Sequence, residues 1–341
     1  MLAAMAEPRT FHEANLWTVA IRDLGLTIEG TRLEPIVAAF AAELERAGIR
    51  RLRPRFYLSM EWGVPFDTIA VAIPFYLARE ELARLHEEQT GHVEGFDRAD
   101  ILRYLRHEMG HAVNYGYRLY EDKDWVAHFG SITQPYVDDY RPAPFSRRFV
   151  RHLPGWYAQK HPDEDWAETF AVWMTPGAKW RQEYAEWPEA LAKLRFCDRT
   201  MKRLRDQEPA VTDDELDEDV GEVTLSVEQF YRQQPQEDGE LPPGLDGALA
   251  AIFADGPAPA DGGAEAAGLI AGAKRDLVAN VYRWTGHFPE RTRELVRHLE
   301  ARARELALGY PEARAAEATM ALTTFVTALA MNYVHRGAYM P

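Results

Sequence analysis

Apolar residues recur at helical spacing early in the chain, and two shorter runs have the composition of strands. The helical positions are Leu33, Ile36, Val37, Phe40 and Leu44, and this helix is expected to end near Gly48. Residues 55–59 and 68–73 are expected to be strands, and Pro74 closes the second because it has no N–H for a sheet. The pattern predicts the beginning of an α+β domain.

A longer helix is predicted from Asp97 to about Tyr120. Asp97 suits the N-cap, where a side-chain oxygen accepts a hydrogen bond from a free backbone N–H. Its recurring apolar positions are Ile101, Leu102, Leu105, Met109, Ala112 and Val113, which indicate one buried face. Gly110 is unfavourable here by about 1 kcal/mol relative to alanine. In a buried helix it indicates close approach of a neighbouring backbone or a substrate.

A second helix is predicted from Asp163 to Trp173. Pro162 stands at its start, acidic residues fill its first turn, and aromatic residues then recur at helical spacing. Later in the chain the pattern predicts one or two amphipathic helices within 178–205, a short strand at 223–227, and helices at 268–285, 289–308 and 311–336. The last three form a small helical unit without a motif.

The helix predicted from Asp97 to about Tyr120 carries the HExxH sequence His107-Glu108-Met109-Gly110-His111. Residues four apart lie on one face of a helix, so both imidazoles can point at one metal ion. Glu108, one step round the helix, can reach a water molecule on that metal. Catalytic zinc takes three protein ligands and leaves a fourth position for water, so a third ligand is required from another segment.

Glu164 and Glu168 are the candidates for that ligand. They are four residues apart and share a face of the second predicted helix. One can bind the metal while the other holds a ligating histidine through its second ring nitrogen. The alternative is a pair of acidic residues on a solvated helix face, which an HExxH motif in the same chain makes less favoured.

The motif together with the stretch EDWAETF, from Glu164 to Phe170, resembles the glutamate-ligand zinc metallopeptidases, or gluzincins. The stretch is similar to bacterial zinc-binding metallopeptidases and to the active-site helix of the anthrax lethal factor and Pro-Pro endopeptidase group. The resemblance covers about residues 100–175. It implies one zinc ion with Glu164 as a ligand, Glu168 orienting a histidine, and Tyr157 assisting at the scissile carbonyl. Two histidines and a carboxylate also suit other metals.

The expected function is therefore that of a zinc-dependent metallopeptidase with a zincin-like catalytic domain. Glu108 is the expected general base for a zinc-activated water that attacks the peptide bond. The exposed sheet edge at residues 56–73 is expected to bind an extended peptide by strand addition. Two alternatives stay open: a zinc-bearing protein that senses or binds peptides without turnover, and a non-peptidase zinc hydrolase. His161 is open between a substrate-side donor and a capping or surface role.

Charge divides the 341-residue chain unevenly. Its net charge is −15, and residues 208–265 contain sixteen acidic residues against one base, Arg232. The rest is close to neutral. An acidic chain argues against nucleic acid as the main partner, because phosphate binding needs clustered Lys and Arg. The expected partners are a peptide or protein substrate and, through the C-terminal helices, a protein.

Three segments are expected: a metallopeptidase domain at 1–206, an acidic and partly flexible linker at 207–265, and a helical C-terminal domain at 266–341. The linker could be a tether or an autoinhibitor, and the tether is favoured. Cys197, the only cysteine, excludes an internal disulfide and is expected in the core. No signal peptide or membrane span is expected, so the expected location is cytoplasmic.

Overall fold

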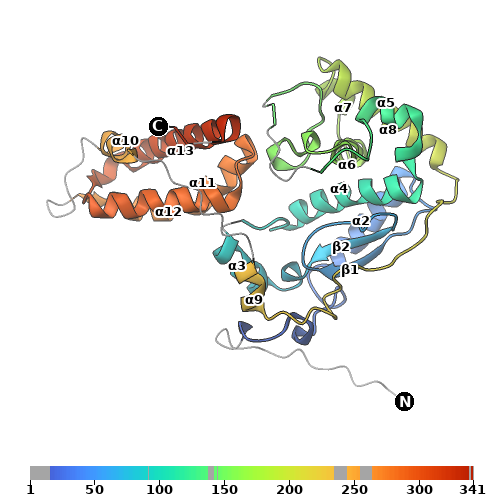
Figure 1. Ribbon diagram of the computed structural model, residues 1–341, viewed down its shortest axis with the longest axis horizontal. Helices are drawn as coiled ribbons and strands as arrows, with labels where there is room; N and C mark the ends of the chain where they lie inside the picture. The colour runs from blue at the N-terminus through green and yellow to red at the C-terminus, as the bar shows by residue number, and fades with distance from the viewer. Residues whose placement is uncertain are drawn as a thin grey trace.

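The computed structural model describes residues 16–90, 92–136, 142–143, 145–233, 244–253, 263–337 and 339–340. This part of the chain is mostly helical and has two small two-stranded sheets (Figure 1). The architecture is α+β with a helical C-terminal region, which confirms the fold class at this level. No helix within the described ranges is long and apolar enough to cross a membrane.

The N-terminal part contains, in chain order, η1 (Ile21–Leu24), α2 (Glu34–Ala47), β1 (Arg55–Ser59), β2 (Ala70–Pro74), η2 (Phe75–Ala78), α3 (Glu80–Thr90), α4 (Arg98–Gly116), η3 (Leu119–Glu121), α5 (Lys123–Phe129), η4 (Pro154–Gln159), α6 (Pro162–Met174), α7 (Trp180–Glu183), α8 (Pro188–Leu204) and α9 (Val227–Gln233). The C-terminal part contains α10 (Leu245–Ile252), β3 (Ala264–Glu265), α11 (Ala266–Thr285), α12 (Pro289–Glu305), β4 (Gly309–Tyr310), η6 (Glu312–Arg314) and α13 (Ala315–Arg336).

The first sheet consists of β1 and β2, which pair in parallel from Arg55 opposite Ala70 to Ser59 opposite Pro74. The predicted strands agree with these bounds to within two residues. The free side of β2 carries one antiparallel bridge, in which the Ala72 N–H donates to the Gly63 carbonyl at 2.8 Å. The segment around Gly63 therefore lies beside β2, at the edge of the sheet.

Helix α4 lies between this sheet and α6 (Figure 1). Its apolar residues pack into a large hydrophobic cluster, the first core, which also receives side chains from α2, β2, α6 and α9. A partly buried ion pair adds to this packing, since Arg106 of α4 donates two hydrogen bonds, at 2.8 and 3.0 Å, to Glu43 of α2. Cys197 is fully buried in α8, as predicted.

The C-terminal helices α10 to α13 enclose a second core of their own. Its fully buried members include Leu249, Ile270, Leu299, Leu322 and Val326. The short strands β3 and β4, which the sequence pattern does not predict, pair antiparallel beside these helices. In the described part of the chain, the first core and this second core lie on opposite sides of residues 234–243 in the sequence.

Two helices within the predicted acidic linker, residues 207–265, pack into the hydrophobic cores. Helix α9 lies within residues 207–265, yet its Phe230 and Tyr231 are buried in the first core. Helix α10 also lies within this range and belongs to the second core. The stretches 234–243 and 254–262 lie outside the described residues.

The predicted strand at 223–227 is wrong. Its residues form one isolated antiparallel bridge, between Ser226 and Ala20, and no ladder with another described strand. The Leu225 and Val223 carbonyls instead accept hydrogen bonds from the backbone of η1, at 2.8 and 3.1 Å. The segment is partly buried and hydrogen-bonds to η1 without joining a sheet.

Candidate metal centre

Helix α4 holds the HExxH side chains in a buried position. Asp97 is its N-cap, as predicted, and its carboxylate accepts a hydrogen bond from the Asp100 N–H at 2.9 Å. The apolar face that packs into the first core leaves the motif on the side that faces α6. His107, Glu108 and His111 are 2%, 5% and 7% exposed. They line a common cavity of about 640 Å³.

Helix α6 brings the acidic partners to these histidines because Gly110 lets the two helices approach closely. A Cβ atom at Gly110 would lie 2.7 Å from the Cα of Ala167. At the same contact the Trp166 indole N–H donates to the Gly110 carbonyl at 2.8 Å. The reason predicted for this glycine, close approach of a neighbouring backbone, is confirmed.

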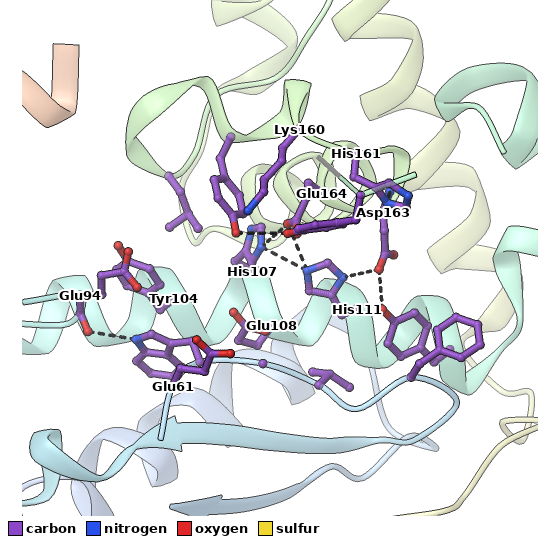
Figure 2. Close-up of a pocket in the computed structure, with 18 of the residues that line it drawn as sticks. Glu61, Glu94, Tyr104, His107, Glu108, His111, Lys160, His161, Asp163 and Glu164 are labelled. Atoms are coloured by element: carbon purple, nitrogen blue, oxygen red, sulfur yellow. Dashed lines mark hydrogen bonds and ion pairs between the residues drawn. The ribbon is translucent and has the colours of Figure 1, made fainter. Parts of the chain in front are cut away.

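The site itself is a triangle of three potential ligand atoms (Figure 2). His107 Nε2 lies 3.0 Å from Glu164 Oε2 and 3.2 Å from His111 Nε2. His111 Nε2 lies 3.4 Å from the same Glu164 oxygen. The structure thus brings together the three predicted ligands, from segments more than fifty residues apart in sequence.

This triangle fits a metal ion. A tetrahedral zinc site with bonds of about 2.0–2.1 Å separates its ligand atoms by roughly 3.3–3.4 Å. The observed separations of 3.0, 3.2 and 3.4 Å are close to that value. When each histidine donates its Nδ1 proton elsewhere, two nitrogen lone pairs and a carboxylate oxygen face one another, and only a cation stabilises such a group. The cluster could therefore hold a metal ion, and its chemistry does not single out zinc.

Glu168 orients the first histidine, the role that the sequence assigns to the acid not used as a ligand. Its Oε1 lies 3.0 Å from His107 Nδ1, and the carboxylate is fully buried. The backbone N–H groups of His152 and Leu153 also donate to it, at 2.7 and 2.9 Å. These contacts hold the carboxylate in place, so the His107 ring is fixed with Nε2 towards the triangle.

Asp163 is the acid beside the second histidine, through an ion-pair contact and not a hydrogen bond, and sequence reasoning missed it. Its Oδ2 lies 3.0 Å from His111 Nδ1, while Asn114 and Tyr115 donate to the carboxylate at 2.6 and 2.5 Å (Figure 2). An acidic residue in the first turn of a helix already has a local explanation in the helix dipole. For that reason Asp163 gives no separate signal in the sequence.

The carboxylates make the triangle strongly negative. Burial opposes a charge on His107, but hydrogen bonds to Glu164 and Glu168 raise its pKa to about 9. Burial is likewise outweighed at His111, whose pKa Asp163 and Glu164 raise well above its usual value. The pKa of Glu164 falls well below its ordinary value because the two histidines outweigh burial. The field that stabilises protons on the histidines also favours a divalent cation at their Nε2 atoms.

Glu108 lies beside the triangle but has no part in it. Its carboxylate faces the cavity, and no hydrogen bond or ion pair reaches it from any residue that the structure describes (Figure 2). Burial raises its pKa, while the charges of His107 and His111 oppose that rise. Burying a carboxylate without a partner costs free energy. Such a residue in a cavity is therefore a candidate for a functional role.

Two tyrosines cover the other side of the triangle. Tyr157, the residue singled out by the resemblance, lines the cavity, and its ring packs edge-on against His107 with centroids 5.6 Å apart. Tyr136, which sequence reasoning did not single out, donates to Glu164 Oε1 at 2.5 Å and lies 3.5 Å from the Tyr157 hydroxyl. The Lys160 ammonium group lies 4.5 Å from the centroid of the Tyr136 ring and 5.3 Å from that of the Tyr157 ring.

His161 has a capping role. Its Nδ1 accepts a hydrogen bond from the Asp163 N–H at 3.2 Å, as the N-cap of α6, and its Nε2 lies 3.0 Å from the Gln134 carbonyl. Of the described residues in the acidic segment 207–265, none lines the cavity. That part of the segment therefore does not block the candidate site.

Comparisons with known proteins add nothing to this geometry. No protein-family model, curated protein or solved structure matches the chain. The fold and the site define the class on their own: a mainly helical α+β protein with a buried cluster of two histidines and a glutamate that could hold a metal ion.

Proposed function

We propose that this protein is a zinc-dependent metallopeptidase with a zincin-like catalytic unit, in which His107, His111 and Glu164 hold one zinc ion. The observation that carries the proposal is the position of Glu108. Its buried carboxylate has no structural partner among the described residues and faces the cavity beside three convergent ligand atoms. This is the arrangement that a general base for metal-assisted hydrolysis requires.

Zinc, when bound, would act as a Lewis acid and lower the pKa of a coordinated water molecule to about 7. Glu108 accepts the proton of the attacking water and delivers it to the amine of the leaving peptide. Its raised pKa, which results from burial, suits a group that must both take up and release a proton. Glu168 and Asp163 keep the two histidines in the tautomer that presents Nε2.

The Tyr157 hydroxyl supplies a hydrogen-bond donor on the far side of the ligands. Tyr157 is the proposed donor to the developing oxyanion, whereas Tyr136, 3.5 Å away, donates its single proton to Glu164. Burial raises the pKa of both hydroxyls above the ordinary tyrosine value, with Glu164 adding to the shift, so both stay protonated. Donors placed where negative charge develops are the usual major source of acyl-transfer catalysis.

A peptide would enter along the segment from Glu61 to Val64, which lines the cavity opposite the histidines. A single isolated bridge joins Gly63 to Ala72, so this segment lies beside β2 without forming a strand of the sheet. An extended substrate could continue the pairing on its outer side and bring a scissile bond over the triangle. The segment falls within the edge, residues 56–73, for which strand addition is expected from the sequence.

A peptide-binding protein without turnover would need the cavity and the strand edge, but not an ionisable carboxylate at Glu108. The non-peptidase hydrolase stays a second possibility with no observation that favours it. The proposal is tested by incubating a diverse peptide library with zinc-loaded protein, with metal-free protein, and with metal-free protein to which zinc is restored. Cleavage at defined bonds should disappear and return with the metal. Cleavage that persists in metal-free protein would refute the proposal.

A further inference from the structure

The cavity at the triangle is separated from a second cavity by two tyrosine side chains. The first has a volume of about 640 Å³ and the second about 370 Å³. Tyr104 and Tyr282 line both. Tyr104 belongs to α4 and is 4% exposed, whereas Tyr282 belongs to α11, the first long helix of the C-terminal unit. One end wall of the candidate active site thus comes from a part of the chain whose sequence contains no motif.

Tyr282 is held in this wall by a tight contact between α11 and η4, the segment that carries Tyr157. Gly155 and Gly286 meet there in left-handed conformations, with φ of 82° and 71°. A Cβ atom at Gly286 would lie 3.0 Å from the Gly155 carbonyl oxygen. Only glycine combines this backbone conformation with so close an approach at low cost. The two units are therefore fitted to each other at this point.

Further contacts fix α11 and α12 on the N-terminal unit (Figure 1). The Arg275 guanidinium pairs with Glu87 of α3 at 2.8 Å and lies 4.9 Å from the ring centroid of Phe96. Arg293 of α12 donates to the Glu88 carbonyl at 3.3 Å. The Tyr282 ring itself packs edge-on against His92, with centroids 5.2 Å apart. These contacts with residues 87–96, together with the contact at η4, hold Tyr282 in the wall.

From this geometry we propose that Tyr282 is a specificity-determining residue, which closes one end of the substrate cleft and limits how many substrate residues can extend in that direction. The proposal rests on the proposed peptidase function, because it assigns a substrate to that same cleft. The C-terminal unit is then part of the catalytic site and not only a tethered interaction module. Discrimination arises from a steric block against the longer ligand.

The second cavity is where a longer substrate would go if the wall were removed. It is lined by Arg103, Arg275 and Arg283 as well as by carboxylates and Asn280. Such a lining can hydrogen-bond both the C=O and the N–H groups of a peptide backbone. Each further residue of an extended peptide needs about 3.3–3.6 Å of length, so joining the cavities would admit additional residues.

The test is a ladder of peptides that share a central sequence and are lengthened one residue at a time at either end. Binding is measured by fluorescence anisotropy with metal-free protein, and cleavage with zinc-loaded protein. Tyr282→Ala opens the wall, Tyr282→Phe keeps the ring, and Trp284→Ala removes an aromatic side chain of the same helix that is 63% exposed and lines neither cavity.

For the wild type, affinity should fall about tenfold or more beyond a fixed length on one side only, a difference of about 1.4 kcal/mol. Tyr282→Ala should remove that limit, and the two control variants should keep it. An unchanged length profile in Tyr282→Ala, or equal tolerance of extension at both ends in the wild type, would overturn the proposal. A length limit in binding without any cleavage would refute only the peptidase function. Absence of binding by every peptide would refute both.

Discussion

Replacing Gly110 by alanine should separate α4 from α6 and weaken the metal site without touching a ligand. The added Cβ would lie 2.7 Å from the Cα and 3.1 Å from the carbonyl oxygen of Ala167. Both are backbone atoms, so no side-chain rotation relieves the collision. Ordinary contacts of this kind lie at about 3.4–4 Å, which means that the helices must move apart by roughly 1 Å.

Two opposing contributions set the change in the free energy of unfolding. Overpacking costs about 1–3 kcal/mol, whereas alanine improves helix propensity by about 1 kcal/mol. The net loss of stability is therefore small, at most about 2 kcal/mol. Metal binding is more sensitive, because ligand distances tolerate deviations of only about 0.2 Å. We expect zinc affinity to fall about 10- to 100-fold or more, at least as much as after loss of an orienting side chain.

The assay compares zinc affinity, by competition with a chromophoric chelator, with urea unfolding of the metal-free proteins. Gly272→Ala is the matched control, because Gly272 is also inside a helix and a Cβ there meets nothing within 4 Å. That control should be more stable than the wild type by about 1 kcal/mol and bind zinc normally. If Gly110→Ala gained stability like the control and kept its zinc affinity, the packing argument would be refuted.

Three further predictions concern the ligands, the core and pH. Glu164→Ala should abolish zinc binding, whereas Glu168→Ala and Asp163→Asn should each weaken it about 10- to 100-fold in the same competition assay; the reverse order would exchange ligand and orienting roles. Lys193→Met removes the ammonium group that lies 2.5 Å from the buried Asp165 carboxylate, and should lower the free energy of unfolding, measured in urea, by about 3–5 kcal/mol. An unchanged urea midpoint would contradict this. Burial lowers the pKa of His287 to about 4, so the unfolded chain binds a proton first as pH falls. The contribution of neutral His287 to the free energy of unfolding is therefore complete above about pH 6.5 and is lost towards pH 4. The loss amounts to about 2 kcal/mol by pH 5. Wild type should lose that much more stability than His287→Gln between pH 7 and 5; equal losses would contradict it.

The elements around the site were predictable because their signals are local. A capping aspartate at Asp97, periodic apolar residues and the HExxH spacing all act within one helix, and the structure places that helix at Arg98–Gly116. The separation of Glu164 and Glu168 likewise fixes that they share a face. Which histidine each acid meets depends on how α6 crosses α4, and that crossing is signalled only by Gly110.

The residues that sequence reasoning missed depend on contacts between distant segments. Tyr136 lies outside any helix or strand, so periodicity says nothing about its hydroxyl, which reaches Glu164. Tyr282 follows its partner Tyr104 by nearly 180 residues and belongs to a helix with its own core. The role of Asp163 becomes visible only when His111 is placed beside it. Tertiary geometry, and not residue type, assigns these side chains to the site.

The most direct measurement compares the wild type with Glu108→Gln, both loaded with zinc, on the same peptide library. The substitution keeps the size of the side chain, removes its ability to accept a proton, and leaves the three proposed ligands in place. Both proteins should bind one zinc ion per chain, and cleavage by the variant should be slower by about 10²- to 10⁴-fold. Equal cleavage by both proteins, or zinc binding by neither, would contradict the account.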